Sequence, residues 1–433
     1  MNKTQNIRAV IFWWLDALKA SPIKKELADI SKSLALYSFE QLKANKKADL
    51  KQLLDTVVRD SKFYHGFKSF NDLEDFPVMN KNIIKENFEA INIPHLPKNL
   101  KKVSSSGSTG IPFAIYQTKR KTRRNKADVL YFANEAGYQV GDALYFVRLW
   151  LKKYQKNRIL QKALNIIPVD IEQLDDKYLS LLINQLKASS SRKGFIGYAS
   201  GFERLCKYLD RIASKPLNCN MQSIIATSES LPEHVREKMA FYFNYPVVSR
   251  YSNEEQGILA QQKQHKTEFT INWASFYIEI LDLHEDKPAK LGDLGRIVVT
   301  DYYNFATPMI RYDTEDLGQF CHFENDGIPK LKTVIGRLKD VLYNTTGEII
   351  NTFVIYGGLL DFPEINDIQI IQKTQHHYLI KLAIHTEFKR VTELKALFQS
   401  LLGSDANTAL EYVTHIEPFK SGKKRFIINE FKS

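Results

Sequence analysis

The chain has 433 residues, of which 44% are hydrophobic and 25% charged, and it contains 19 glycines and 14 prolines. This ordinary globular composition excludes collagen-like, low-complexity and intrinsically disordered proteins. Lysine and arginine outnumber aspartate and glutamate by 61 to 49, and the net charge of +12 fits a plain basic surface, anionic small molecules or a membrane surface. No nucleic-acid-binding module is recognisable, so we predict no nucleic-acid partner.

The cysteine content and the hydropathy predict a cytoplasmic protein. Cys206, Cys219 and Cys321 form no CxxC pair, which excludes a Cys-rich metal site and argues against a disulfide framework. No apolar run reaches the length of about 18 residues that a membrane-spanning helix needs. The apolar run near the start is interrupted at Asp16 and no convincing cleavage site follows, so we expect no secretion signal.

Residues 9–18 are predicted to form a helix with apolar side chains on much of its surface. Two interpretations remain open for this helix. It packs on the body of the protein, or it lies on a membrane or against a partner, flanked by Lys19, Lys24 and Lys25. The second interpretation makes the protein peripheral to the inner face of the cell membrane.

The following elements are predicted from the hydrophobic pattern. Residues 1–100 are mostly helical, with a turn at 76–80 and a further helix after it. A Ser/Gly/Thr cluster at 104–110 is the strongest interruption in the chain, and a strand follows at 112–116. Helices and strands then mix as far as residue 320. Helices are predicted at 124–137, 173–188 and 233–243, and strands at 143–149, 222–226, 246–250, 276–281 and 296–300.

The C-terminal part is predicted to be a separate small domain with short alternating strands at 368–371 and 378–383, a helix at 390–402 and a basic tail. We therefore predict an α/β (α+β) fold. It consists of a large multi-layer N-terminal domain over residues 1–336, with a helical lead-in, and a small mobile α+β domain over residues 337–433. The hinge is expected near residues 336–340.

The segment Ser104–Pro112, SSSGSTGIP, carries the main chemical signal. Two glycines allow a sharp turn and a close approach of the backbone to an anion, and the hydroxyl groups add donors beside the backbone N–H groups. The segment is not a Walker A loop, because GxxxxGK[ST] is absent. Taken alone, it fits a flexible surface loop better than a phosphate-binding loop.

Four later stretches place this loop in a wider pattern, namely YSNEEQG, TPMIRYDTEDLG, GRLKD and SGKKR. In this order and spacing, the five motifs resemble the adenylate-forming superfamily, whose members activate a carboxylate with ATP. The stretches FKSFNDLEDFPVMNKNIIKENF and FWWLDALKASPIKK resemble the phenylacetate–coenzyme A ligase branch and, within it, the CapK-like capsular polysaccharide biosynthesis proteins. The resemblance covers nearly the whole chain.

The resemblance implies that the serine-rich loop holds the β and γ phosphates of ATP. The lysine that often follows Gly-x-Pro in the superfamily is replaced by Phe113, as is common in the phenylacetate branch. The residues assigned to this role are Ser105, Ser106, Gly107, Ser108, Thr109 and Gly110.

Residues 251–255 align with the superfamily's Tyr-Gly-x-Thr-Glu. The resemblance implies that Tyr251 lies against the adenine and that Glu255 is catalytic and binds Mg²⁺, a cation that prefers oxygen ligands. Ser252 replaces the glycine, Asn253 takes the variable position, and Glu254 replaces the threonine that touches the α-phosphate. An acidic side chain at that position would repel a phosphate unless it turns away or binds metal.

The remaining motifs imply further roles. Asp316 would accept hydrogen bonds from the ribose hydroxyls, Arg337 would contact ribose or phosphate, and Lys339 would be the hinge residue. Lys423 would be the catalytic lysine of the small domain, where its ammonium group would offset charge in the transition state. Its neighbour Lys424 and a plainly solvated basic tail are the alternatives.

Two upstream segments resemble parts of the same site. Ser228, Glu229 and Ser230 resemble the adenine-binding segment, and residues 197–200 resemble the helix entry beside the acyl pocket, although Ser200 also fits an ordinary helix cap. No cysteine lies between residues 220 and 320, and the histidines show no ligand spacing, so we predict no zinc.

The resemblance implies an enzyme that forms an acyl-adenylate and pyrophosphate from ATP, Mg²⁺ and a carboxylic acid. The acyl group would then pass to coenzyme A, or to an amine or hydroxyl acceptor in capsule or surface polysaccharide biosynthesis. The alternative is a catalytically weak nucleotide-binding scaffold in a membrane-associated polysaccharide assembly, which Ser252 and Glu254 favour. A homodimer is plausible from the branch.

Overall fold

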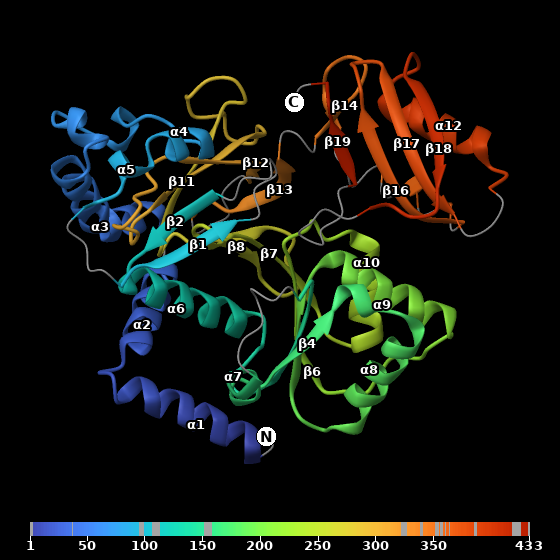
Figure 1. Cartoon of the computed structure of the whole chain (residues 1–433), viewed down its shortest axis with the longest axis horizontal. Helices are drawn as coiled ribbons and strands as arrows, with labels where there is room; N and C mark the ends of the chain where they lie inside the picture. The colour runs from blue at the N-terminus through green and yellow to red at the C-terminus, as the bar shows by residue number, and fades with distance from the viewer. Residues whose placement is uncertain are drawn as a thin grey trace. The chain divides into compact units, whose positions relative to one another are not determined.

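The computed structural model of the chain divides into two compact units, and each is described by itself (Figure 1). One comprises Met1–Leu231 and Val235–Val334, and the other comprises Pro232–His234 and Ile335–Ser433. The structure describes residues 3–36, 38–94, 99–105, 113–150, 158–321, 327–337, 341–350, 355, 358–359, 361–362, 364–384, 388–417 and 426–431.

The larger unit begins with helices, as predicted, and more helices alternate with its central strands. The α-helices are α1 (Lys3–Ala17), α2 (Pro22–Leu34), α3 (Phe39–Asp60), α4 (Lys81–Glu86), α5 (Phe88–Ile91), α6 (Lys119–Glu135), α7 (Arg158–Ala163), α8 (Asp176–Ala188), α9 (Ala199–Arg211) and α10 (Glu233–Phe243). Short 3₁₀ turns are η1 (Tyr64–Phe67), η2 (Leu73–Asp75) and η4 (Ile171–Gln173). Among the described residues, no helix is long and apolar enough to cross a lipid bilayer.

An 11-stranded sheet forms the centre of the larger unit, in the order β10-β11-β12-β13-β9-β8-β7-β6-β5-β3-β4. Strands β4, β3, β5, β6 and β7 run parallel, whereas β8 pairs antiparallel with β7 and β9 with β8. A separate hairpin joins β1 (Lys101–Ser105) to β2 (Phe113–Gln117). The sheet strands are β3 (Ala143–Arg148), β4 (Ile166–Asp170), β5 (Lys193–Gly197), β6 (Met221–Thr227), β7 (Val247–Asn253), β8 (Gly257–Gln262), β9 (Phe269–Ile271), β10 (Phe276–Leu281), β11 (Gly295–Asp301), β12 (Tyr312–Phe320) and β13 (Leu331–Arg337).

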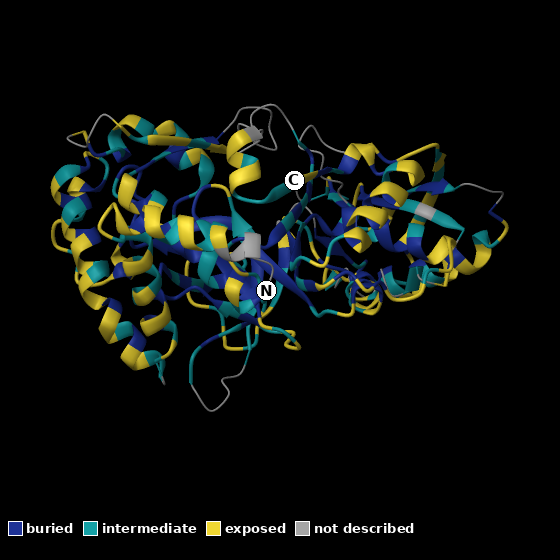
Figure 2. Ribbon diagram, turned by 90° about the horizontal axis from the view of Figure 1, so that it is seen from below, coloured by how far each residue is buried: buried dark blue, intermediate teal, exposed yellow. Residues whose placement is uncertain are grey.

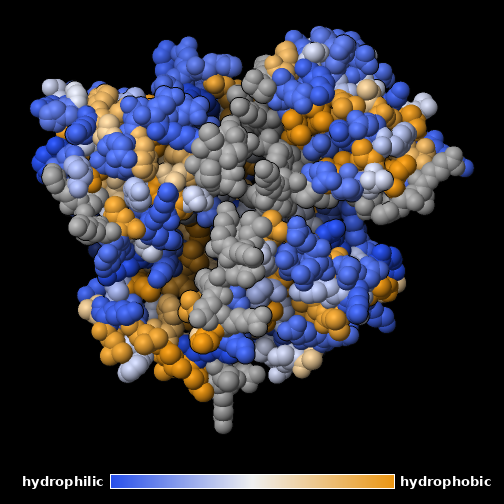
Figure 3. Space-filling model, viewed as in Figure 1, coloured by the Kyte–Doolittle hydropathy of each residue, from blue (hydrophilic) through white to orange (hydrophobic). Residues whose placement is uncertain are grey.

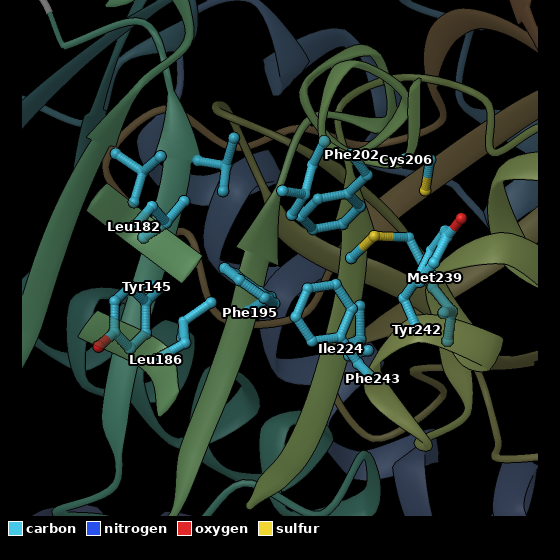
Figure 4. Packing of buried hydrophobic residues seen from close by; sticks show 14 of the residues in the cluster. Tyr145, Leu182, Leu186, Phe195, Phe202, Cys206, Ile224, Met239, Tyr242 and Phe243 are labelled. Carbon is cyan, nitrogen blue, oxygen red and sulfur yellow. The ribbon is translucent and has the colours of Figure 1, made fainter. Parts of the chain in front are cut away.

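Helices α8, α9 and α10 cover one face of the parallel strands. In α8, Leu179, Leu182, Ile183 and Leu186 recur at helical spacing and are all buried. They join a core in which Phe195 of β5 lies among side chains from the neighbouring strands and helices (Figure 4). Buried and exposed residues accordingly fall on opposite sides of many helices (Figure 2).

The smaller unit contains a second sheet, in the order β18-β17-β16-β19, and one described α-helix that packs against it. Strands β16 and β17 pair antiparallel, and β18 and β19 each pair parallel at an edge. The elements are β14 (Leu342–Tyr343), β15 (Ile349–Ile350), β16 (Ile365–Gln372), β17 (His377–Ile384), α12 (Val391–Leu402), β18 (Asn407–Val413) and β19 (Ile427–Asn429). The predicted α/β (α+β) class is confirmed, with a large mixed sheet and a small C-terminal sheet domain.

The predicted turn at residues 76–80 is wrong. This segment is extended, and Met79 forms a parallel bridge with Tyr312. The Met79 N–H donates to the Arg311 carbonyl at 2.8 Å, and the Asp313 N–H donates to the Met79 carbonyl at 2.7 Å. The guanidinium of Arg311 also donates to the carbonyl of Phe76 at 3.0 Å. Long-range hydrogen bonds therefore override the local turn signal of the Phe-Pro pair.

An ionic cluster around the buried Arg124 and Lys46 joins the lead-in helices to the sheet. Arg124 of α6 is fully buried and donates to Asp29 at 2.6 Å and to Glu26 at 2.9 Å, both on α2. The same guanidinium donates to the carbonyl of Ala274 at 2.8 Å. Lys46 of α3 reaches Asp29 at 3.1 Å. Three helices that precede or flank the hairpin are thus held against the strand region by shared carboxylates.

We expect Arg124→Ala to destabilise the larger unit by about 3–5 kcal/mol, because it removes the guanidinium beside the buried Asp128 and beside Glu26, and leaves Asp29 with Lys46 as its cation. Urea denaturation measures this change. Arg59→Ala is the matched control, since its partner Asp60 lies in an exposed pair worth less than about 1 kcal/mol. Equal losses for the two variants would contradict the stabilising role of the cluster.

Candidate active site

The predicted site residues from two motifs lie at the carboxyl edge of the parallel strands. Strand β6 ends at Thr227 and leads into Ser228–Ser230, and β7 ends at Asn253 and leads into Glu254 and Glu255. In open α/β sheets, ligands bind in the crevice beyond this edge. Ser228 has a φ of 71°, a left-handed conformation that costs a non-glycine residue energy and often occurs at functional sites.

Glu229 caps the first turn of α9. Its carboxylate accepts hydrogen bonds from the Ser200 N–H at 2.8 Å and from the Ser200 hydroxyl at 3.1 Å. The N-cap residue of this helix, Tyr198, makes no side-chain cap bond, so Glu229 supplies the acceptor from outside the helix. Ser228 and Ser230 on either side of it are exposed. Glu229 therefore stabilises the start of α9, and the two hydroxyl groups beside it are accessible.

Tyr251 and Asp316, predicted from separate motifs, are in direct contact. The Tyr251 hydroxyl donates to Asp316 at 2.8 Å and lies 3.2 Å from the Thr314 hydroxyl. Burial raises the pKa of Tyr251 well above its usual value, and the nearby Asp316 carboxylate raises it further, so the phenol keeps its proton. A residue of β7 thereby orients the half-buried carboxylate of Asp316 on β12. The hydrogen bond from Tyr251 uses one of the two carboxylate oxygens, Oδ2.

Glu255 is a buried carboxylate beside a lysine. Its side chain is 6% exposed, and an oxygen lies 3.9 Å from the ammonium group of Lys81. Lys81 also lies 3.5 Å from Glu315, whose φ is 66°. Lys81 is a site residue that the motifs did not predict. Its signal was present in the stretch FPVMNK, which carries part of the family resemblance.

The hairpin that flanks the glycine-rich segment is attached to Glu255. Gln117, at the end of β2, donates from its side chain to the backbone carbonyl of Glu255 at 2.9 Å. The Tyr116 N–H donates to the Thr307 hydroxyl at 3.0 Å. Strand β2, which follows the segment, is therefore connected to the two motif regions that follow β7 and precede β12.

Ser252, Asn253 and Glu254 have different surroundings. The Ser252 hydroxyl lies 3.4 Å from that of Thr227. Asn253 exchanges hydrogen bonds with Gln256, accepting from its backbone N–H at 2.7 Å and donating to its side chain at 2.9 Å, which shapes the turn into β8. Glu254 is exposed. Solvation reduces the repulsion that its carboxylate would exert on a phosphate.

Several predicted residues lie outside the described residues. Ser105 and Arg337 end strands β1 and β13, but their side chains are not among those described. The others are Ser106, Gly107, Ser108, Thr109, Gly110, Lys339 and Lys423. Their roles stay predictions.

The residues at Glu255 fit a bound Mg²⁺. In the described part of the chain, no group of three or more His, Cys, Asp or Glu side chains could hold a metal ion by itself. Mg²⁺ instead is usually held by one or two carboxylates together with phosphate oxygens and water. The Glu255 carboxylate, buried and with Lys81 at only 3.9 Å, is a suitable single ligand.

The chain is similar to several known proteins. Residues 342–430 match the CapK C-terminal domain family. Protein CapK of Staphylococcus aureus is 26% identical over 406 residues, which covers 87% of this chain and 86% of that protein. A 2-hydroxyisobutyryl-CoA ligase in the postadenylation state, in complex with R3-HIB-AMP, superposes with a TM-score of 0.71 and 16% identity over 91% of both chains.

The chain therefore has the fold of this acyl-CoA ligase. ATP-bound MatB from Rhodopseudomonas palustris has the same fold, with a TM-score of 0.56 and 13% identity over 75% of this chain and 66% of that one. The similarity to CapK makes the present chain a distant relative of that protein over most of its length.

We expect Asp316→Ala to weaken the binding of ATP about tenfold or more, because it removes a charged acceptor at the site. Tyr251→Phe should weaken binding less, by about fivefold, because the carboxylate remains but loses its orienting donor. Isothermal titration calorimetry with ATP and Mg²⁺ measures both. Asp55→Asn, on the exposed side of α3, is the control. Wild-type affinity in Asp316→Ala would contradict the assignment of this site.

Proposed function

We propose that the chain activates a carboxylic acid with ATP. A carboxylate oxygen of the acid attacks the α-phosphorus, the bond to the bridging oxygen breaks, and pyrophosphate leaves with its electron pair, which yields an acyl-adenylate. The observation that carries the proposal is the contact of Tyr251 with Asp316 next to the buried Glu255, at the edge where the hairpin of the glycine-rich segment is attached.

The chemistry explains why these residue types are required. Attack of an anion on a polyphosphate is opposed by charge repulsion, so the site must offset charge and hold the reactants in line. In the described residues, Lys81 supplies a cation beside Glu255 and Glu315. Asp316, held by Tyr251, is suited to accept hydrogen bonds from a diol such as ribose. Lys423, by resemblance, would offset charge during the transfer.

Glu255 is the residue that we propose as the Mg²⁺ ligand. Bound Mg²⁺ would neutralise charge on the phosphates of ATP. The protein's own contribution is to keep this carboxylate buried and anchored, since the backbone carbonyl of Glu255 accepts a hydrogen bond from Gln117.

For the second step, we propose transfer of the acyl group to coenzyme A or to an amine or hydroxyl acceptor. The structural similarity to a 2-hydroxyisobutyryl-CoA ligase supports the thiol acceptor and a phenylacetate–coenzyme A ligase-like reaction. The relationship to CapK supports a role in capsular or surface polysaccharide biosynthesis, where a saccharide precursor would be the acceptor.

A nucleotide-binding scaffold is the second candidate. Ser252 and Glu254, which depart from the superfamily motif, are the observations that favour it. The exposure of Glu254 reduces the weight of this argument, because a solvated carboxylate does not have to oppose a phosphate.

The proposal is tested by ATP–pyrophosphate exchange with a panel of aryl, aliphatic and uronic acids. We expect exchange with at least one acid, and a decrease of about a hundredfold or more in Glu255→Gln and in Lys423→Ala. Glu89→Gln, an exposed carboxylate on α5, is the matched control for Glu255→Gln, and Lys424→Ala tests the alternative lysine. ATP binding without exchange for any acid would support the scaffold instead.

A further inference from the structure

Several buried basic side chains of the larger unit have carboxylates or backbone carbonyls as partners. Lys121 is fully buried and forms an ion pair with Asp301 at 2.7 Å. Arg124 has the carboxylates of α2. Lys193 has no anionic partner in the part of the chain that the structure describes, but it donates to three backbone carbonyls, including that of Cys219 at 2.9 Å. Each of these cations is therefore compensated within the chain.

Arg250 of β7 is the exception. It is 6% exposed, and its Nε donates to the side-chain oxygen of Gln261 at 2.8 Å. Its Nη2 is buried and has no hydrogen-bond partner, and in the described part of the chain no carboxylate lies within ion-pair distance of the guanidinium. Burial lowers the pKa of Arg250 to about 9, which reflects the penalty of an uncompensated interior charge. Such a group is suited to an anion that comes from outside the chain.

The strand register shows which face Arg250 occupies. It pairs in register with Thr227 of β6, at the carboxyl edge of the parallel strands. Val247 and Ala226 belong to the core under α8–α10, and Val248 instead packs with Ala133 of α6. Because side chains alternate along a strand, Arg250 and Thr227 lie on the face that α6 covers.

Arg148, the last residue of β3, lies on the same face of the sheet. Its neighbour Val147 is in register with Gly197, which is in register with Ala226, so Arg148 occupies the row of Thr227 and Arg250. Two arginines thus stand at one edge of one face, three strand spacings apart, a separation of roughly 14 Å. Arg250 directly precedes Tyr251, which contacts Asp316 on β12.

We propose that Arg250 binds a second anionic group of the acid that this protein activates. The substrate class is then a carboxylic acid that carries a further carboxylate, phosphate or sulfate a few bonds from the reacting carboxylate. Arg250 and Tyr251 are consecutive residues at the carboxyl end of β7, on opposite faces of the strand, so the second anion is expected close to the strand end that Tyr251 occupies. This role of Arg250 rests on the proposed adenylation and would determine which acids the protein activates.

The test compares ATP–pyrophosphate exchange with matched acids, such as succinate against butyrate, and 3-phosphoglycerate against glycerate. We expect the wild-type kcat/KM to favour the acids with a second anion. In Arg250→Gln this preference should fall about thirtyfold or more, mainly through KM, and Arg250→Lys should restore part of it. The preference is a ratio within one variant, so a general loss of stability does not change it.

Thr227→Asp provides a second variant, because it places a carboxylate beside the guanidinium and should lower the same preference without removing the arginine. Exchange with no acid would refute the proposed function itself. Exchange without a preference for the second anion, or a preference that is unchanged in Arg250→Gln, would overturn this inference alone, and a buried water molecule would then be the partner of Nη2.

A separate observation concerns α1. Of its described side chains, only Asp16 is buried, and five large apolar side chains of α1, together with Leu18 just after it, are between 47% and 66% exposed. They are Ile7, Val10, Ile11, Trp14, Leu15 and Leu18. Figure 3 shows the corresponding apolar surface along the lower left edge of the molecule, where Figure 1 places α1. An apolar patch on an isolated surface helix indicates an interaction site.

The charges around this patch are of one sign. Asp16 is the only acidic residue between positions 7 and 25. Its carboxylate accepts hydrogen bonds from the N–H groups of Ile23 and Lys24 at 3.1 and 3.0 Å, at the start of α2. The exposed residues Lys19, Lys24 and Lys25 therefore surround the patch without an exposed acid among these positions.

The geometry points to an anionic lipid surface as the occupant, with the apolar side chains of α1 in the interface and the lysines against the headgroups. Sedimentation with phosphatidylcholine vesicles that contain phosphatidylglycerol tests it. We expect binding that weakens with salt, and a loss of about tenfold or more in the double variant Val10→Asp, Trp14→Asp. Phe241→Asp, an exposed apolar residue on α10, is the control.

Absent or salt-independent binding would overturn the lipid assignment. A concentration-dependent dimer that the double variant abolishes would identify a second copy of the chain as the occupant instead, and light scattering distinguishes the two cases.

Discussion

The parallel pairing of β4, β3, β5, β6 and β7 is the constraint on which the rest of the site depends. Parallel strands deliver their carboxyl ends to one edge of a sheet, so the segments after β6 and β7 meet there although other elements separate them in the chain. The pairing has to be buried on both faces. Helices α8–α10 cover one face, and α6 lies against the other.

Side chains of the motif regions have two kinds of task. Some build the site: Glu229 caps α9, Asn253 shapes the turn into β8, and Arg311 anchors the extended segment around Met79. Others present groups that a ligand can use, as Asp316 does behind the Tyr251 hydroxyl. A motif in the sequence does not distinguish these tasks, because both depend on the same position at the strand end.

Buried charges of the larger unit also have two kinds of surroundings. The cluster around Arg124 satisfies its cations with carboxylates from α2 and thereby fastens the lead-in helices. Near the candidate site the compensation is looser: Lys81 lies between two carboxylates at 3.5 and 3.9 Å, and Arg250 has no anion among the described residues. Interior charges that are incompletely paired are costly, and they are typical of places where a ligand completes the arrangement.

The sequence by itself determined the class of the fold and many of its elements. Helix 233–243 and strand 276–281 coincide with α10 and β10, because hydrophobic periodicity and turn residues act over short distances. Only the tertiary structure decided that residues 76–80 are extended, that Glu229 caps α9 and that Lys81 lies at Glu255. It also decided that Arg250 is buried with no counterion among the described residues. Each of these depends on groups far apart in the chain, and the local pattern around a residue contains no information about which distant group will lie beside it.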